Sequence, residues 1–235
     1  MLYKLDAVKD NLRNREGKRV FYLGKSDQLT SEARDWLNRE RIAILPAEQA
    51  AKQRYALLRG GYVEEKPEHM THLNGDVLVS KLHPRILFRG AVDHLEAELI
   101  LAQLAVGEPY RKSLEEILNL ARKLIRCDVL EEKLELDKLC GLTEAEMRKR
   151  SHRPQEYYGQ AHFMPSAEDG MGIARLNQAR CACREAELKA LAAFSDREGN
   201  PTRVDILRAL NRMSSMIYIL MVQMKAEIDC GKGDL

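Results

Sequence analysis

Apolar residues recur every three or four positions over most of the second half of the chain. The recurrence runs through residues 84–106, 112–134, 167–194 and 200–228, with a shorter segment at 143–150. This spacing gathers apolar side chains on one face of a helix. The pattern therefore predicts a mainly α protein, built as an antiparallel bundle of about five helices.

Helix start signals accompany the apolar segments. Proline fits the first turn of a helix, and Ser or Thr followed three residues later by Glu forms a capping box. The expected starts are Pro84 in a first turn, capping boxes at Ser113–Glu116 and Thr143–Glu146, and Asn200 as the N-cap before Pro201.

The first part of the chain has a different pattern. Two segments are typical of strands, "RVFYLG" and "IAIL", and between them "TSEARDWLNRER" is typical of a short helix opened by a Thr or Ser cap. Residues 1–50 are therefore expected to form a small strand–helix–strand appendage. Residues 51–83 contain Gly60, Gly61, Pro67 and Gly75, which disfavour long helices or strands. They are therefore expected to form an extended or looped connector with a phosphate-binding loop. Residues 84–230 would then form the helical bundle domain.

Composition narrows the function classes. Lys and Arg number 38 against 36 Asp and Glu, so no broad cationic surface for nucleic acid is predicted, and any anion site must be local. The sequence contains no run of about 18 apolar residues, so no membrane span is expected, and its first residues do not have the pattern of a signal peptide. The five scattered cysteines are typical of reduced thiols in a cytoplasmic protein.

A polar stripe interrupts the apolar helix at 167–194. Arg180, Arg184 and Glu187 stand at i, i+4 and i+7, which places them along one side of a helix. The stripe is either a solvated face or a site for a polyanion. In the last helix, Asn211 falls near a polar line on a mostly apolar surface, where it either faces water or has a partner.

Two further features allow two interpretations each. Asp93 sits among apolar residues of its helix and is either a surface residue or the partner of an arginine on a neighbouring helix. Backbone N–H groups of a turn together with a lysine can cradle phosphates, although a plain loop has the same composition. The residues of this candidate cradle are Thr71, Gly75, Asp76 and Lys81.

Four segments occur in the order found in one protein family. They are "THLNGDVLVSKLHPR", "PRILFRGAVDHLEAEL", "ARCACREAEL" and "LNRMSSMIY". Through them the chain resembles the ethanolamine-utilisation type of cobalamin adenosyltransferase, a relative of the propanediol-utilisation type. The resemblance implies a helical bundle, usually trimeric, that holds ATP between neighbouring subunits and transfers its 5′-deoxyadenosyl group to the cobalt of reduced cobalamin, releasing triphosphate.

The resemblance also implies roles for individual residues. Arg180 and Arg184 would contact the ATP phosphates with help from Glu187 and Asn211, and Asp93 would pair with Arg180, making Asp93 and Arg180 the catalytic pair. Thr71, Gly75, Asp76 and Lys81 would form the triphosphate cradle, with Mg²⁺ on the phosphates. Phe163, and after it Met164, would lie against cobalamin in the loop "HFMPSAEDG".

The resemblance extends to partners and has limits. It implies a homo-oligomer, a flavoprotein reductase as electron donor and an adenosylcobalamin-dependent lyase as product acceptor. It also implies a location in the cytoplasm, which includes the interior of a bacterial microcompartment. Some relatives hold a metal with a Cys cluster, but the connector here contains no cysteine, so no structural metal is expected. A di-iron bundle is disfavoured because the expected helices contain no Glu-x-x-His pair. The alternative that remains is a non-catalytic scaffold or cofactor chaperone of a microcompartment.

Overall fold

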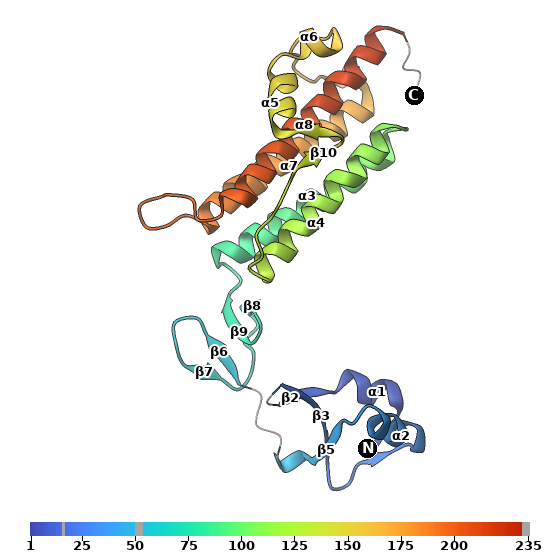
Figure 1. The fold of residues 1–235 in the computed structure, drawn as a ribbon, viewed down its shortest axis with the longest axis vertical. Helices are drawn as coiled ribbons and strands as arrows, with labels where there is room; N and C mark the ends of the chain where they lie inside the picture. Colours follow the sequence, from blue (N-terminus) through green and yellow to red (C-terminus); the bar gives the residue numbers. More distant parts are fainter. Residues whose placement is uncertain (16, 50–53, 232–235) are drawn as a thin grey trace. The chain divides into compact units, whose positions relative to one another are not determined.

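The chain is mainly helical, as the apolar pattern predicts. The computed structural model describes residues 1–15, 17–49 and 54–231. They divide into two compact units, Met1–Pro67 and Glu68–Leu235, each with its own elements (Figure 1).

The first unit combines short strands with two helices. Its elements are β1 (Leu2–Tyr3), α1 (Leu5–Asp10), β2 (Arg13–Arg15), β3 (Lys18–Leu23), β4 (Gln28–Leu29), α2 (Ser31–Arg39), β5 (Ala43–Pro46), the 3-10 turn η1 (Ala47–Gln49), β6 (Tyr55–Leu57) and β7 (Tyr62–Val63). Strands β3 and β5 pair in parallel on either side of α2 in sequence, with β2 antiparallel to β3. Phe21 and Leu37 are fully enclosed in the core of this unit, and the Thr30 hydroxyl caps α2.

The second unit opens with a hairpin and continues as helices. Its elements are β8 (Met70–Asn74), β9 (Val77–Ser80), α3 (Pro84–Ala105), α4 (Tyr110–Val129), β10 (Lys138–Leu139), β11 (Leu142–Thr143), α5 (Glu144–His152), α6 (Pro154–Tyr158), the 3-10 turn η2 (Ala167–Asp169), α7 (Gly170–Ala193) and α8 (Val204–Asp229).

The long helices pack side by side around one core. Helix α3 lies between α4 and α7, α8 packs on α7, and the short α5 and α6 lie against α8 (Figure 1). Pairs of side chains show that neighbours run antiparallel: Phe88 near the start of α3 meets Phe194 just after α7, with ring centroids 5.3 Å apart. Glu98 further along α3 meets Gln178 nearer the start of α7.

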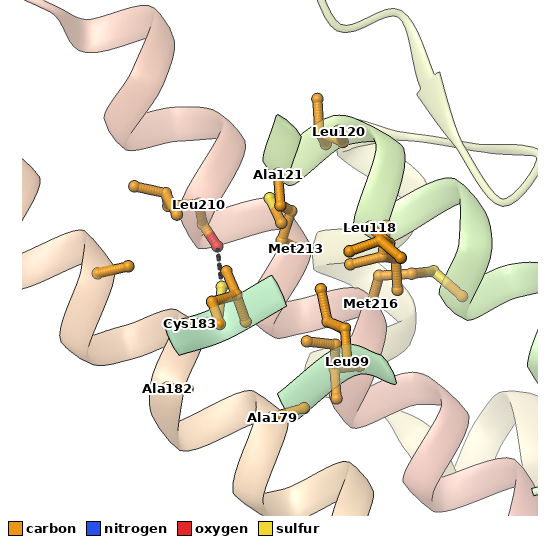
Figure 2. Close-up of a cluster of buried hydrophobic side chains, with 14 of the residues drawn as sticks. Leu99, Leu118, Leu120, Ala121, Ala179, Ala182, Cys183, Leu210, Met213 and Met216 are labelled. Atoms are coloured by element: carbon orange, nitrogen blue, oxygen red, sulfur yellow. Dashed lines mark hydrogen bonds between the residues drawn. The ribbon is translucent and has the colours of Figure 1, made fainter. Parts of the chain in front are cut away.

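Small and flexible side chains fill the centre of this core. Figure 2 shows Ala179, Ala182 and Cys183 of α7 facing Leu210, Met213 and Met216 of α8. The Cys183 thiol donates a hydrogen bond to the Leu210 carbonyl oxygen at 3.2 Å (Figure 2). Alanines let the helix axes approach closely, and each fully buried Leu contributes roughly 1.5–3 kcal/mol.

The helix start signals are right in part. Pro84 occupies the first turn of α3, and Thr143 and Glu146 form the predicted capping box. The Ser113–Glu116 box is wrong: α4 already begins at Tyr110, and Glu116 instead accepts the backbone N–H of Cys140 at 2.9 Å. The competing partner comes from a loop 24 residues away, which local sequence does not show.

The last helix also begins later than predicted. Asn200 is not its N-cap, because Asn200 donates its backbone N–H to the Asp196 carboxylate at 2.7 Å and closes a turn. Helix α8 begins at Val204, after Arg203.

The end of the predicted connector forms a regular hairpin. Strands β8 and β9 pair antiparallel, with Asn74 opposite Val77 and the turn at Gly75–Asp76, where Gly75 has φ +49°. Glycine at the first position of a two-residue turn between two apolar runs is a hairpin signal, and here it outweighs the loop-like composition. Leu73, Leu78 and Val79 are buried side chains of this hairpin.

Candidate functional site

The predicted polar stripe lies on α7. Arg180 and Glu187 are half-buried and Arg184 is exposed. Beneath them the helix buries small residues, Ala179, Ala182, Cys183 and Ala186. The stripe therefore stands at the margin of the helical core, where Arg180 is partly solvated and Arg184 is open to water.

Asn211 of α8 joins the stripe to a second arginine. Its side-chain N–H donates to Glu187 Oε1 at 3.1 Å, and its side-chain oxygen accepts from Arg212 Nη2 at 2.7 Å. Only this orientation of the amide satisfies both neighbours, because a carboxylate accepts and a guanidinium donates. The structure thus brings Asn211 and Glu187 together, and their predicted role towards ATP stays a prediction.

The arginines beside the core have unused donors. The Nε atoms of Arg180 and Arg212 are both buried, and neither has a hydrogen-bond partner among the described residues. A buried N–H without a partner costs about 1–3 kcal/mol. Such groups mark a place where water or a bound molecule completes the hydrogen bonding.

Arg180 rests on an aromatic ring. Its guanidinium carbon lies 5.7 Å from the ring centroid of Tyr218 on α8. The Tyr218 hydroxyl lies 2.7 Å from His162 Nδ1, and His162 Nε2 lies 3.3 Å from the His152 carbonyl oxygen. With Nε2–H donating to that carbonyl, Nδ1 accepts the tyrosine hydroxyl. Burial raises the pKa of Tyr218, outweighing a backbone hydrogen bond from Phe163 and the charge of Arg180, so the hydroxyl stays protonated and can donate.

Asp93 does not pair with Arg180 in this chain. The carboxylate is exposed on α3, and no ion pair joins these two described residues. The 2.9 Å hydrogen bond between Gln178 and Glu98 places Arg180 near the level of Glu96 on the antiparallel helix, about one turn from Asp93. The expectation that Asp93 holds Arg180 is therefore corrected for the single chain: the group that contacts Arg180 is Tyr218.

The candidate phosphate cradle is the turn and base of the β8–β9 hairpin. Thr71 lies within β8, opposite Val79, rather than in a loop. Gly75 and Asp76 form the exposed turn, and Lys81 is exposed just after β9, with its ammonium 3.9 Å from Glu68. The hairpin precedes α3, at the end of the unit where Phe88 meets Phe194. Arg184 lies ten residues before Phe194, about 15 Å along the helix. Among the described residues, no hydrogen bond or ion pair joins the cradle to the stripe.

The loop expected to face cobalamin leads from α6 towards α7. Phe163 is half-buried and packs against the helical core, next to His162. Met164 is 89% exposed. Phe163 is therefore held in place by packing, whereas Met164 extends into solvent.

Sequence reasoning missed three groups of this site. Tyr218 and Arg212 lie at the polar line of α8 but had no assigned role, and His162 precedes Phe163 without any motif of its own. The signal that could have identified Arg212 is its position next to Asn211 on a mostly buried helix. No local signal identifies the Tyr218–His162 pair, whose members are 56 residues apart.

In the described ranges, no group of three or more His, Cys, Asp or Glu side chains is placed to hold a metal ion. None of the helices in the described part of the chain has the length and apolar character needed to cross a membrane.

Two half-buried arginines, Arg180 and Arg212, lie beside a carboxylate, an amide and an aromatic ring, and this helical protein therefore has a candidate anion site. The chain matches the family model of cobalamin adenosyltransferases over residues 61–224, more than half of its length, and it belongs to this family.

Named relatives agree with the family. The chain is 37% identical over 160 residues to corrinoid adenosyltransferase EutT of Salmonella typhimurium. It is 35% identical over 160 residues to corrinoid adenosyltransferase EutT of Escherichia coli K12. Each alignment covers 68% of this chain and 60% of the relative, so the chain spans less than two thirds of the length of these curated relatives.

Proposed function

We propose that this protein transfers the 5′-deoxyadenosyl group of ATP to the cobalt of reduced cobalamin and serves ethanolamine utilisation. In this reaction a bond forms between cobalt(I) and C5′, and the bond between C5′ and the triphosphate oxygen breaks. The observation that carries the proposal is the arginine stripe of α7, with Arg180 half-buried and Arg184 exposed, found within the part of the chain that matches the family. We place the helices in the bundle arrangement of that family.

The stripe suits the departing triphosphate. Negative charge grows on this group in the transition state, and fixed cations aimed at it lower the barrier more than they stabilise the bound substrate. Arg180 and Arg184 would supply the forked donors for the phosphate oxygens. Asn211 and Glu187, already joined at 3.1 Å, would face the nucleoside side of ATP.

A second protomer would complete the site. Within one chain, no hydrogen bond or ion pair of the described residues joins the β8–β9 cradle of Thr71, Gly75, Asp76 and Lys81 to the stripe. ATP would reach both if the cradle of one subunit meets the stripe of its neighbour. Exposed Asp93 would then be free to meet a cation of that neighbour.

Apolar surface on the outer helices supports a homo-oligomer, for which we favour a trimer. On α3, Leu101 and Leu104 are exposed, and on neighbouring α7, Met171 and Leu188 are 64% and 68% exposed. Large apolar side chains in such numbers on adjoining helices are typical of protein–protein contacts. Mg²⁺ would enter with the nucleotide, whose phosphate oxygens are ligands that it prefers.

The loop at Phe163 would bind cobalamin. An apolar wall beneath the corrin ring excludes water and eases formation of cobalt(I). Phe163 is already packed at its base, and exposed Met164 would contact the ring on binding. A flavoprotein reductase would supply the electron, and an adenosylcobalamin-dependent lyase would take the product, in the cytoplasm or within a microcompartment.

An anaerobic spectral assay with ATP and reduced cobalamin tests the activity directly, because the cobalt–carbon product has its own spectrum. Equilibrium ATP binding to wild type and to Arg184→Ala tests the stripe, with Arg148→Ala as the control. Arg184 and Arg148 are both exposed helical arginines, but Arg148 lies on α5, outside the stripe.

We expect Arg184→Ala to weaken ATP binding about tenfold or more, and Arg148→Ala to leave it unchanged. Equal ATP affinity in all three proteins, together with no spectral product, would favour the non-catalytic scaffold or cofactor chaperone instead.

A further inference from the structure

One carboxylate at the end of α4 is completely enclosed. The Asp128 side chain has 0% exposure and binds two arginines of α3: Arg85 Nε lies 2.8 Å from Oδ1 and Arg89 Nε 2.6 Å from Oδ2. Arg85 Nη2 also donates to the Asp128 backbone carbonyl at 2.7 Å. Both oxygens of Asp128 are therefore used, and each fixes the plane of one guanidinium.

The remaining donors of Arg89 reach the β8–β9 hairpin. Arg89 Nη2 donates to the Leu73 carbonyl at 2.8 Å, and Nη1 to the His72 carbonyl at 3.4 Å. Asn74 of the hairpin makes a second contact: its side-chain N–H donates to Oε1 of Glu131, a residue just after the end of α4, at 3.4 Å. The hairpin is thus tied to both α3 and α4 within the second unit.

Two kinds of contact hold the hairpin within the second unit, and they act differently. Leu78 and Val79 are buried, but apolar contacts are not directional. The directional contacts to the backbone of β8 are the hydrogen bonds from Arg89, and Asp128 binds the Nε of that guanidinium.

We propose that Asp128 is a positioning residue for the nucleotide: through Arg89 it orients the hairpin that presents Gly75, Asp76 and Lys81 to the triphosphate. This inference rests on the proposed adenosyltransferase function. Asp128 itself is fully buried and touches no substrate. It acts by keeping a guanidinium from turning away from the backbone of β8.

A matched control exists at the same end of the helices. Asp205 accepts hydrogen bonds from Arg203 Nε and Nη2 at 2.9 and 2.8 Å and from the Leu134 backbone N–H at 2.8 Å. This pair is as well formed as the Asp128 pair, but it makes no contact with the hairpin residues that the structure describes. Asp205→Asn therefore reports what loss of a partly buried ion pair does to stability alone.

The variants to compare are Asp128→Asn, Arg89→Lys and Asp205→Asn in the full chain. Arg89→Lys keeps a positive charge for Asp128, but its single nitrogen cannot occupy the three separate donor positions from which the guanidinium reaches Asp128 and the two carbonyls. Each variant is assayed for KM of ATP, KM of reduced cobalamin and kcat, well below its Tm. Amide hydrogen exchange of residues 70–80 is measured in parallel.

We expect Asp128→Asn and Arg89→Lys to raise KM for ATP about tenfold, leave KM for cobalamin unchanged and increase exchange in the hairpin. Asp205→Asn should lower Tm without either change. The inference is overturned if all three variants behave alike, or if the hairpin exchanges as in wild type.

Two outcomes need separate treatment. Should Asp128→Asn not fold, Arg89→Lys and its exchange data decide in its place. A wild type that binds ATP but forms no cobalt–carbon product would refute the proposed function, while the change in hairpin exchange and in ATP affinity would still decide the role of Asp128.

Discussion

Replacing Tyr218 tests whether an aromatic ring, rather than a carboxylate, holds Arg180, the arginine proposed to contact the ATP phosphates. Tyr218→Leu removes the ring under the Arg180 guanidinium and the hydroxyl bound to His162. Tyr218→Phe removes only the hydroxyl. If the ring positions Arg180 for ATP, the two variants must differ in nucleotide binding.

The magnitude follows from the contact. A cation over an aromatic ring contributes about 0.5–1 kcal/mol when exposed and about 2 kcal/mol when desolvated. Arg180 and Tyr218 are both half-buried, with a centroid distance of 5.7 Å. Since about 1.4 kcal/mol is a tenfold change, Tyr218→Leu should weaken ATP binding between about twofold and about thirtyfold.

The phenylalanine variant should show a different pattern. It keeps the ring face, so ATP affinity should stay within about twofold of wild type. Loss of the 2.7 Å hydrogen bond to His162 should cost about 1 kcal/mol of stability and lower Tm by roughly 2–4 °C.

Calorimetric titration with ATP and Mg²⁺ measures the affinities, and thermal unfolding measures Tm. Tyr157→Leu is the control, because Tyr157 has Lys149 and Arg150 over its ring at 5.6 and 5.4 Å but lies on α6, away from the stripe. Wild-type affinity in Tyr218→Leu would refute this role of the ring, as would an equal loss in Tyr218→Phe.

Three other predictions follow from burial and charge. Exposed Cys181 and Cys230 should react with a thiol reagent at pH 8 in the folded protein. The other three cysteines should react only after denaturation, because burial raises the pKa of their thiols. Fast reaction of all five thiols in the folded protein would contradict this. Burial would raise the pKa of Asp205, but hydrogen bonds from Arg203 and the Leu134 backbone outweigh it and lower the pKa to about 2. Because the folded pKa lies below the unfolded value, the stabilisation is present above about pH 4 and lost as pH falls through 2. Denaturant unfolding should therefore give Asp205→Asn a free energy of unfolding about 2 kcal/mol lower than that of wild type at pH 7. The difference should vanish near pH 2, and a difference that stays constant with pH would exclude this cause. Phe163→Ala should slow adenosylation that starts from cobalt(II) while calorimetric ATP affinity stays as in wild type, and unchanged rates would remove Phe163 from the mechanism.

Local pattern accounts for most of the helical unit. The apolar period of 3.6 residues marks the long helices, and the Thr143–Glu146 box is formed as predicted because both partners lie within four residues. The same locality explains the failure at Ser113–Glu116, where Cys140 from a distant loop takes the glutamate. Patterns within one turn of a helix are legible unless a tertiary contact competes for the same group.

For the site, the sequence by itself determined that Arg180, Arg184 and Glu187 share one side of a helix, because helical geometry fixes neighbours at i, i+4 and i+7. It could not decide which groups from other helices meet them. Only the tertiary structure decided that Tyr218 rather than Asp93 contacts Arg180, and that Asp128 is fully buried between two arginines. Asp128 lies 39 and 43 residues from those arginines, so its partners depend on how antiparallel helices align, which no spacing within a single helix encodes.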